Sequence, residues 1–475
     1  SLKNTSLDLR VSYLVLKAYK YVIVLKIKSF INQFVMRKNI KKYIDIVFVI
    51  LREQNLGHKD IDHILPFLYF LSKSDVFDYK ATGLVLENEA NYKKNTDPRV
   101  NLLANLKNVN LKFLYDDNFF SKIKELSELR GTSTLTKIFK SILNRIYLNQ
   151  LKKRYKKLDL KSKLGEFFLK SKSPIVITLH ANDEAQEIVS RIKKLNKKAK
   201  WIVLPDGTTI CDNKMVVDTN LEQNDDKNLR LNYKRYKELD FLLQTSNRDL
   251  QDAISSGLDN VKGFVIGSPR FSRDWLEVKT KLKLDGKNVI KNNKYKVKIL
   301  FLIPKRHINI FNEELVRTID FISSYNEIEL ALLNYNFNYP SLPIYIKSRP
   351  NLTQYLISKD YSTSKLIDWA DIVFHVGTGV IFESFIKEKI TVLPRYLSSN
   401  TLISEKYNAG FNLKNRDDLR TLCNSAVKSL KMLKSHYKKK CGVSNEKFIN
   451  DFINANSKSV KKNIEKKLLK ICNSF

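Results

Sequence analysis

The sequence predicts an α/β protein with two domains, each built on a parallel sheet covered by helices. Short apolar runs alternate with amphipathic segments along most of the chain, which is the pattern of strands joined by crossover helices. The alternation occurs in two series, separated by an aperiodic stretch rich in lysine and asparagine at residues 283–296. A chain of 475 residues also exceeds what one hydrophobic core usually holds.

The first series predicts seven strands. They are YIDIVFVI (43–50), TGLVLE (82–87), VNLKFLY (109–115), PIVITL (174–179), KWIVLP (200–205), FLLQTS (241–246) and GFVIGS (263–268). Amphipathic segments at 58–73, 119–130 and 183–197 predict helices between them. Long basic segments over residues 133–170 interrupt the series and predict a helical insertion.

The second series predicts five more strands, followed by C-terminal helices. The strands are VKILFLIP (297–304), IELALLN (328–334), LPIYIK (342–347), DIVFHV (371–376) and ITVLP (390–394). We therefore expect an N-terminal helical segment at 1–42, a first Rossmann-like domain at 43–285 and a second at 286–475. Two such domains make the architecture called GT-B, in which ligands lie between the carboxyl ends of the two sheets.

The cysteines favour a reducing compartment. None of the four, Cys211, Cys423, Cys441 and Cys472, forms a CxxC pair, which argues against a zinc site or a disulfide framework. A cytoplasmic location is the expectation.

The charge balance favours anionic partners. The chain has 85 basic and 49 acidic residues, a formal charge of +36. The lysines are spread along the whole chain beside abundant Asn, Ile, Tyr and Phe, which is also the composition that an AT-rich genome produces. No RNP-like aromatic strand, zinc-finger spacing or basic heptad region is present, so a dedicated nucleic-acid-binding protein is not expected.

Residues 11–38 combine Leu, Val, Ile and Phe with lysines at positions 17, 20, 26 and 28. These lysines interrupt the apolar run well short of the ~18–20 residues that a membrane span needs. As a helix, the segment would either lie in the interface of an anionic membrane or pack on the protein's own core.

The motif HVGTGVIFES, residues 375–384, follows a predicted strand and leads into a predicted helix. Its small residues let backbone N–H groups approach a phosphate, and its glutamate follows one turn later, where it can accept hydrogen bonds from sugar or ribose hydroxyls. A plain glycine turn with a solvated glutamate is the alternative. The candidate binding residues here are His375, Gly377, Thr378, Gly379, Glu383 and Ser384.

Basic residues follow several other predicted strands. They occur in GSPRFSRDW (267–275), PKRH (304–307) and SRP (348–350), while LPDGTT (204–209) follows an earlier strand. Basic side chains that converge on one phosphate turn would stabilise the charge that develops on a diphosphate leaving group. The candidates from these segments are Ser268, Arg270, Lys305, Arg306 and Arg349.

Taken together, these motifs resemble those of GT-B transferases of bacterial surface polysaccharides. That group includes the CDP-glycerol glycerophosphotransferases of teichoic acid synthesis and Kdo-type capsule transferases. The resemblance spans about residues 174–410 and includes LPDGTT, YKELDFLLQTSNRDLQDAI (236–254), GSPRF, Arg349 and DWADIVFHVGTGVIFESFIKEKITVLP. The sequence departs from the family at Asp206, where the related turn often has His.

The resemblance implies that the second domain binds a nucleotide-activated donor and the first domain binds the acceptor. Lys305, Arg306 and Arg349 would then contact the donor phosphates, the glycine turn would anchor them, and Glu383 would bind the sugar. No cofactor is expected beyond the donor, which is of CMP, CDP or UDP type.

Transfer also needs a base on the acceptor side. REQNLGHKDIDH, residues 52–63, follows the first predicted strand and offers His58 and Asp60. His58 is the preferred base because a histidine titrates near neutral pH, and Asp60 and Asp206 are its competitors. Asp60 and Asp62 form a DxD sequence, but at the start of a helix such acids cap N–H groups, so no metal is expected. His180 could line the cleft, but a structural histidine is the preferred interpretation.

The leading functional hypothesis is a cytoplasmic glycosyltransferase, peripheral at the inner face of an anionic membrane. It would move a sugar from a nucleotide sugar to a lipid-linked acceptor or a growing surface glycan such as capsule or lipopolysaccharide. A CDP-polyol phosphotransferase of teichoic-acid type, a GT-B sugar-nucleotide epimerase and a non-catalytic basic binding protein are the alternatives.

Overall fold

The structure is a computed structural model of the chain. It describes residues 41–50, 58–89, 97–115, 158–172, 174–207, 232–289, 294–304, 310–334, 339–357 and 361–474, together with residues 142, 153 and 210. The amphipathic segment expected at 11–38, the helix expected at 119–130 and most of the expected insertion at 133–170 lie outside these residues.

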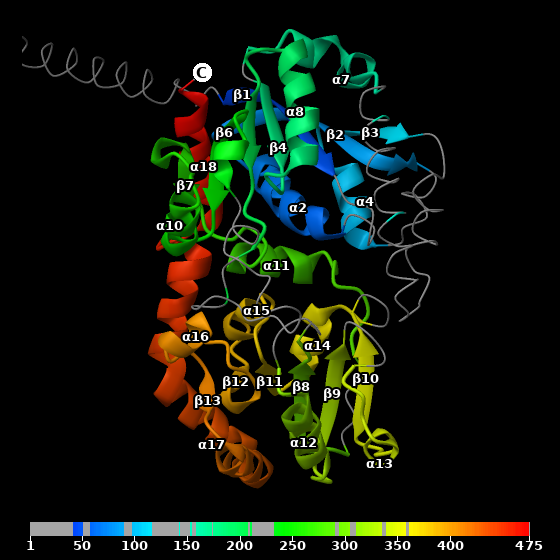
Figure 1. The fold of residues 1–475 in the computed structure, drawn as a ribbon, viewed down its shortest axis with the longest axis vertical. Helices are drawn as coiled ribbons and strands as arrows, with labels where there is room; N and C mark the ends of the chain where they lie inside the picture. Colours follow the sequence, from blue (N-terminus) through cyan, green and yellow to red (C-terminus); the bar gives the residue numbers. More distant parts are fainter. Residues whose placement is uncertain are drawn as a thin grey trace, which may run out of the picture.

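The first domain contains a parallel sheet of seven strands in the order β3-β2-β1-β4-β5-β6-β7 (Figure 1). Its strands are β1 (Lys42–Ile50), β2 (Phe77–Asn88), β3 (Val109–Tyr115), β4 (Pro174–Thr178), β5 (Lys200–Val203), β6 (Leu239–Gln244) and β7 (Gly263–Val265). Its helices are α2 (His58–Ser72), α4 (Pro98–Asn105), α7 (Leu160–Leu169), α8 (Asp183–Leu195), α10 (Asn247–Ser255) and α11 (Arg273–Lys281).

The second domain contains a parallel sheet of six strands in the order β10-β9-β8-β11-β12-β13. Its strands are β8 (Val297–Leu302), β9 (Ile328–Asn334), β10 (Leu352–Leu356), β11 (Ile372–His375), β12 (Ile390–Pro394) and β13 (Phe411–Leu413). Its helices are α12 (Asn312–Ser323), α13 (Ile344–Lys347), α14 (Thr363–Trp369), α15 (Ile381–Ile386), α16 (Ile403–Lys406) and α17 (Arg416–Ile449). Both sheets have the strand order of a Rossmann fold, so the predicted fold class is confirmed.

Each sheet is buried on both faces, as expected for parallel sheets. In the first domain, α2 and α4 cover one face around Ile46 and Phe48, while α7, α8 and α10 cover the face of Val47 and Val49. In the second domain, α12 and α17 pack on one face and α14 on the other. This double burial explains why most strands read as continuous apolar runs in the sequence.

One predicted strand is wrong. LPIYIK forms the short helix α13, in which Ile346 is buried while Ile344 and Tyr345 are 84% and 59% exposed. The strand of this region is β10, whose sequence LTQYL has two polar residues at its centre and which lies at the edge of the sheet with four of its five residues partly exposed. A half-exposed edge strand lacks the apolar run that identified its neighbours.

The C-terminal helices do not all belong to the second domain, as the 286–475 boundary predicted. After α17, a π-helix at Asn450–Asn454 leads to α18 (Val460–Cys472), which lies against the first domain (Figure 1). The apolar face of α18, including Ile464 and Leu468, is part of the same core as β1 and α2. The assignment of α18 is therefore corrected, because the pattern of an amphipathic helix does not say which sheet it covers.

None of the helices within the described ranges is both long and apolar enough to cross a bilayer.

Candidate functional site

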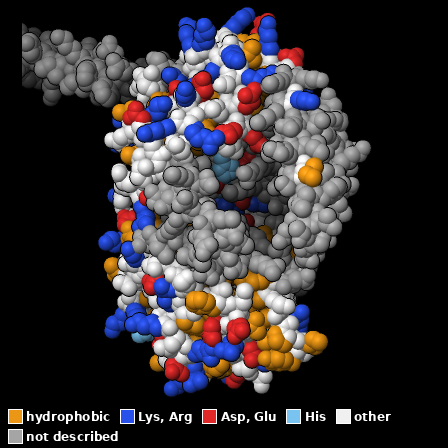
Figure 2. Space-filling model, viewed as in Figure 1, with side chains coloured by type: hydrophobic (Ala, Val, Ile, Leu, Met, Phe, Trp, Pro, Cys, Tyr) orange, Lys and Arg blue, Asp and Glu red, His pale blue; other side chains and the backbone are white. Residues whose placement is uncertain are grey.

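The loops at the carboxyl ends of the two sheets approach each other where the domains meet. The segment after β5 extends to Ile210, whose carbonyl accepts a 2.8 Å hydrogen bond from the N–H of Ile403 at the start of α16. A Cβ atom placed on Gly379, in the turn after β11, would lie 3.8 Å from the side chain of Ile210. Between the domains the surface is hollowed, and a histidine and charged side chains line the hollow (Figure 2).

A histidine and an aspartate meet at this edge of the first sheet. His180 follows β4 and Asp206 follows β5, and the Nδ1 atom of His180 lies 3.2 Å from Oδ2 of Asp206. The two side chains are 20% and 37% exposed. A carboxylate beside Nδ1 orients the ring and holds a proton on that nitrogen, which leaves Nε2 as the basic atom, and this atom is buried in the structure.

The backbone around His180 is held by a short chain of hydrogen bonds. The indole N–H of Trp201 donates to Thr178 Oγ1 at 2.9 Å, and the Thr178 hydroxyl donates to the carbonyl of His180 at 2.9 Å. Trp201 and Thr178 are both buried. The turn that carries His180 is therefore anchored to two neighbouring strands.

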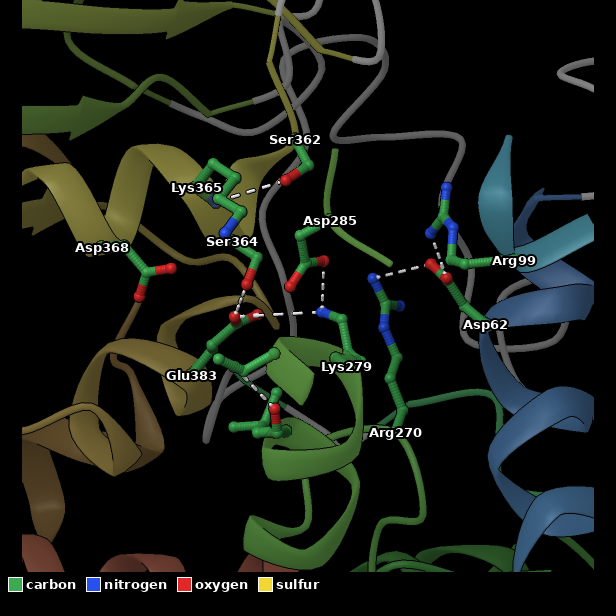
Figure 3. Close-up of polar contacts among 12 residues, drawn as sticks. Asp62, Arg99, Arg270, Lys279, Asp285, Ser362, Ser364, Lys365, Asp368 and Glu383 are labelled. Atoms are coloured by element: carbon green, nitrogen blue, oxygen red, sulfur yellow. Dashed lines mark hydrogen bonds and ion pairs between the residues drawn. The ribbon is translucent and has the colours of Figure 1, made fainter. Parts of the chain in front are cut away.

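Two arginines and an aspartate form a second cluster on the same edge (Figure 3). Asp62, on the first turns of α2, pairs with Arg99 at the start of α4 and with Arg270 at 3.2 Å. Arg270 also approaches Nε2 of His63 at 3.5 Å. Burial opposes ionisation of Asp62, but these neighbouring cations outweigh it and lower the pKa of its carboxyl. Asp62 thus remains ionised and positions Arg270 at the domain boundary.

A buried carboxylate joins the two domains in a third cluster. Glu383 of α15 is 4% exposed and lies 2.8 Å from Lys387 and 4.0 Å from Lys279 of α11, and it accepts a hydrogen bond from Ser364 (Figure 3). Lys279 pairs in turn with Asp285 at 2.9 Å. Burial raises the pKa of Glu383, but the two lysines and the hydrogen bonds overcome this and lower it to about 2.

No protein-family model matches this sequence, and no curated protein sequence matches it either. Among solved structures, the UDP-GlcNAc 2-epimerase from Methanocaldococcus jannaschii is similar, with a TM-score of 0.50 and 13% identity over 91% of this chain and 100% of that one. The chain has the GT-B fold.

Two other solved structures are similar to this chain at lower TM-scores. A glycosyltransferase from Rickettsia africae has a TM-score of 0.46 and 13% identity, over 92% of this chain and 98% of its own. The wall teichoic acid polymerase TagF has a TM-score of 0.47 and 13% identity, over 94% of this chain and 97% of its own. Because its identity is 13%, the likeness to the epimerase shows the GT-B fold and nothing finer.

Within the GT-B cleft, the glycine turn has the expected form. The segment from Gly377 leaves β11 with φ of 98° at that glycine and enters α15, which confirms the predicted strand-to-helix turn. Gly377, Thr378 and Gly379 are partly exposed, whereas Ser384 is buried and its hydroxyl bonds to Ile381 and Thr391. The donor contacts of this turn stay predictions.

His375 and Glu383 are more deeply buried than the sequence suggested. The ring of His375 is 2% exposed, and burial lowers its pKa to about 3, so it is neutral at physiological pH. Its Nδ1 atom has no hydrogen-bond partner among the described residues. The carboxylate of Glu383 is occupied by two lysines and a serine, so its contact with a sugar also stays a prediction.

The GSPRF motif, which follows the last strand of the first domain, contacts the π-helix at one end and α2 at the other. Gly267 has φ of 85° and Ser268 donates its N–H to the carbonyl of Ile453 at 2.7 Å, so this half of the turn packs on the π-helix. Arg270 extends toward the cleft and α2. The motif that was expected to bind the donor therefore lies on the first-domain side of the cleft.

Arg349 is not brought to the cleft. It precedes β10 and pairs with Asp320 at 2.5 Å, and it donates to Ser323 at the last turn of α12. Because α12 runs back from the carboxyl edge of the sheet, its last turn lies at the amino edge. The strand-end argument for Arg349 was therefore wrong, since it depended on a strand that is the helix α13.

Three predicted residues cannot be placed. Lys305 and Arg306 lie outside the described residues, and so does the side chain of His58. Asp60 is 2% exposed on the first turn of α2.

Within the described part of the chain, no three His, Cys, Asp or Glu residues are grouped so that they could hold a metal ion.

Sequence reasoning did not select His180 as a functional candidate, and it missed Lys279. His180 was interpreted as structural, although its position after an apolar run, in line with Asp206 after the next run, was the available signal. Lys279 lies in an ordinary amphipathic helix among many lysines, and nothing in its neighbourhood distinguishes it. Its importance comes from a contact with the other domain.

Proposed function

We propose that the protein is a GT-B glycosyltransferase that moves a sugar from a nucleotide-activated donor to a lipid-linked or growing surface glycan. The observation that carries the proposal is the His180–Asp206 pair at the carboxyl edge of the first sheet, together with Ile210, four residues after Asp206, beside Gly379 of the glycine turn in the second domain. A GT-B cleft with an acid–base pair on one wall and a glycine turn on the other suits transfer from a nucleotide donor.

In the proposed reaction, the donor lies against the second domain and the acceptor hydroxyl against the first. His180 Nε2 takes the proton of the hydroxyl while its oxygen forms a bond to the anomeric carbon of the donor sugar. The bond from that carbon to the phosphate oxygen breaks, and its electron pair leaves with the nucleotide. Asp206 stabilises the imidazolium that results.

The leaving nucleotide needs positive charge around its phosphates. Lys305 and Arg306 are the candidates from the second domain, and Arg270 can contribute from the first. No cofactor is part of the proposal. Its setting is the cytoplasmic side of the membrane, where nucleotide sugars and lipid-linked acceptors meet.

The donor is identified first by thermal stabilisation of the full chain with UDP, GDP, CDP and CMP. A nucleotide at 100 times its Kd adds about 2.7 kcal/mol to stability. Stabilisation by one of them supports a nucleotide-dependent enzyme, whereas stabilisation by none would contradict the proposal and favour a basic binding protein.

The chemistry is tested with the matching nucleotide sugars and a glycolipid acceptor. We expect His180→Ala to lower turnover by about 10²–10⁴ with nucleotide affinity little changed, and Asp206→Asn to do the same less severely. His58→Ala is the matched comparison, because His58 and Asp60 are competing candidates for the base. Full activity in His180→Ala with collapse in His58→Ala would transfer the role to His58.

Product analysis separates the related activities. Release of free nucleotide together with a glycosylated acceptor supports the proposal. An epimerised nucleotide sugar formed without acceptor would indicate an epimerase, and transfer of a polyol phosphate with release of CMP would indicate a phosphotransferase.

A further inference from the structure

The outer face of α17 carries an uncompensated row of lysines. Residues 419–445 contain no aspartate or glutamate, although seven lysines and arginines lie among them. Lys434 pairs with Asp371 at 3.1 Å and Lys440 lies over the ring of Phe411. Lys431, Lys438 and Lys439 are exposed and form no ion pair with any described residue.

Two exposed apolar side chains stand on the same face as these lysines. Met432 is 71% exposed and Val443 is 87% exposed. They are three helical turns apart, so they project in the same direction, with Lys439 between them. We define the α17 basic face as Lys431, Met432, Ser435, Lys438, Lys439 and Val443, all of which are exposed.

The opposite face of α17 is fixed by the core of the second domain. Leu433, Tyr437 and Cys441 are buried against the sheet, so the helix cannot rotate to hide the α17 basic face. The helix is interrupted at Ser429, where φ is −160°. All residues of the α17 basic face come after this break, so they lie on one continuous segment of helix. Basic side chains gather at the lower left of Figure 2, where Figure 1 places α17.

The lysines of this face destabilise the helix when no partner covers them. Like charges spaced three or four residues apart, such as Lys434 and Lys438, repel each other by a few tenths of a kcal/mol per pair. Exposed Met and Val side chains in such a row add nothing to folding. A partner that is both anionic and apolar at its surface would compensate both features.

We propose that the α17 basic face docks on an anionic lipid bilayer, with its lysines among the headgroups and Met432 and Val443 at the edge of the acyl region. Aliphatic side chains among lysines are typical of membrane-surface helices. Single-stranded nucleic acids are bound instead with the help of exposed aromatic rings for base stacking, and the one aromatic residue of this segment besides His436, Tyr437, is buried. The proposal is independent of the proposed activity.

The first experiment measures binding of the full chain to vesicles of phosphatidylcholine, with and without an equal part of phosphatidylglycerol. We expect binding to the anionic vesicles, and about a hundredfold weaker partitioning for the triple variant Lys431→Gln, Lys438→Gln, Lys439→Gln, because each lysine near an anionic surface contributes roughly tenfold or less. Lys458→Gln, Lys462→Gln, Lys466→Gln removes the same charge from exposed positions in α18 and just before it, and serves as the matched control.

An equal loss in the two triple variants would show a general charge effect and overturn the proposal. So would unchanged binding of the α17 variant, which would place membrane attachment elsewhere in the chain.

The second experiment tests the apolar contribution. We expect Met432→Ser with Val443→Ser to weaken vesicle binding by about tenfold, because both side chains lose apolar contact with the bilayer, and to leave binding to single-stranded DNA unchanged. Circular dichroism checks that each variant keeps its helices. Weaker DNA binding in the lysine variant, with vesicle binding unaffected by the Met and Val changes, would identify nucleic acid as the partner instead.

Discussion

Glu383 shows how one buried carboxylate can connect two domains. Its neighbours are Lys387 on the next turn of its own helix, Ser364 on α14 and Lys279 on α11 of the first domain. A buried charge of this kind is tolerated because several partners surround it.

We predict that Glu383→Gln lowers the free energy of unfolding by about 1.5–3 kcal/mol, because the charge-assisted hydrogen bond with Lys387 is lost while Lys387 keeps its 2.7 Å ion pair with the half-exposed Asp368. Chemical denaturation near neutral pH is the measurement. Glu313→Gln is the matched control, since Glu313 forms an exposed ion pair with Arg317 whose loss should change stability by less than about 0.5 kcal/mol.

The pH dependence distinguishes this ionic role from simple packing. The pKa of Glu383 falls from its ordinary value of 4.5 to about 2 on folding, so the folded state binds fewer protons between these values. Its stabilising contribution is therefore complete above about pH 4.5 and is lost as the pH falls through 2. The difference between wild type and Glu383→Gln should shrink over this range, and a difference that stays constant would contradict the ionic role.

At the residue scale, the sequence predicts the local role of a residue, such as a turn glycine or an acid in a helix, better than it predicts which residue that side chain contacts. The glycines after β11 and the acid in the following helix were recognised, because turn geometry and helix starts are local properties. The pairing of His180 with Asp206 and of Glu383 with Lys279 depends on strand order and domain contact. Neither can be read from residue spacing.

The turn that begins at Gly267 joins the first domain to the π-helix before α18. Its left-handed φ of 85° is unfavourable for residues with a side chain, and an added Cβ would lie 2.5 Å from the carbonyl oxygen of Ile453. The same carbonyl accepts the hydrogen bond from Ser268. This turn therefore requires glycine for two independent reasons.

We predict that Gly267→Ala destabilises the protein by at least about 1–3 kcal/mol, because both the backbone conformation and the contact become strained. Thermal unfolding is the measurement. Gly442→Ala in α17 is the control of opposite sign, since its Cβ would meet only Lys438 at 3.8 Å and alanine favours a helix by about 0.5–1 kcal/mol. A neutral Gly267→Ala would mean that the contact with Ile453 is not maintained in solution.

At the element scale, burial on both faces makes the central strands predictable. IELALLN and ITVLP coincide with β9 and β12 because central parallel strands need apolar side chains on both faces. The edge strands β10 and β13 were missed, and LPIYIK was misread because a single amphipathic turn is too short to show a helical period.

At the scale of the molecule, α18 links the end of the described chain to its first sheet. Lys42 of β1 donates to the carbonyl of Cys472 at 2.8 Å, and Asn463 donates to Val265 of β7 at 3.3 Å. The two-domain division and the cleft followed from the two series of strands. The return of α18 could not be predicted, because it depends on which core has an uncovered face.

We predict that Leu468→Ala lowers the free energy of unfolding by about 2–5 kcal/mol, the usual cost of a buried leucine, and that it loosens the first domain. Hydrogen exchange should show lost protection in β6 and β7. Lys466→Ala on the exposed side of the same helix should change stability by less than about 0.5 kcal/mol. Lost protection confined to the second domain would contradict the assignment of α18.

The path of α18 also sets an order of events during biosynthesis. Domains usually fold as units while the ribosome is still extending the chain, with the N-terminal one first. Here the first sheet emerges early, but the helix that completes one of its cores is translated only after the whole second domain. Until then, apolar residues around β1 and α2 remain uncovered. The first domain is thus the earlier to be made and the later to be finished, and chaperones that shield exposed apolar surface have the longest time to act on it.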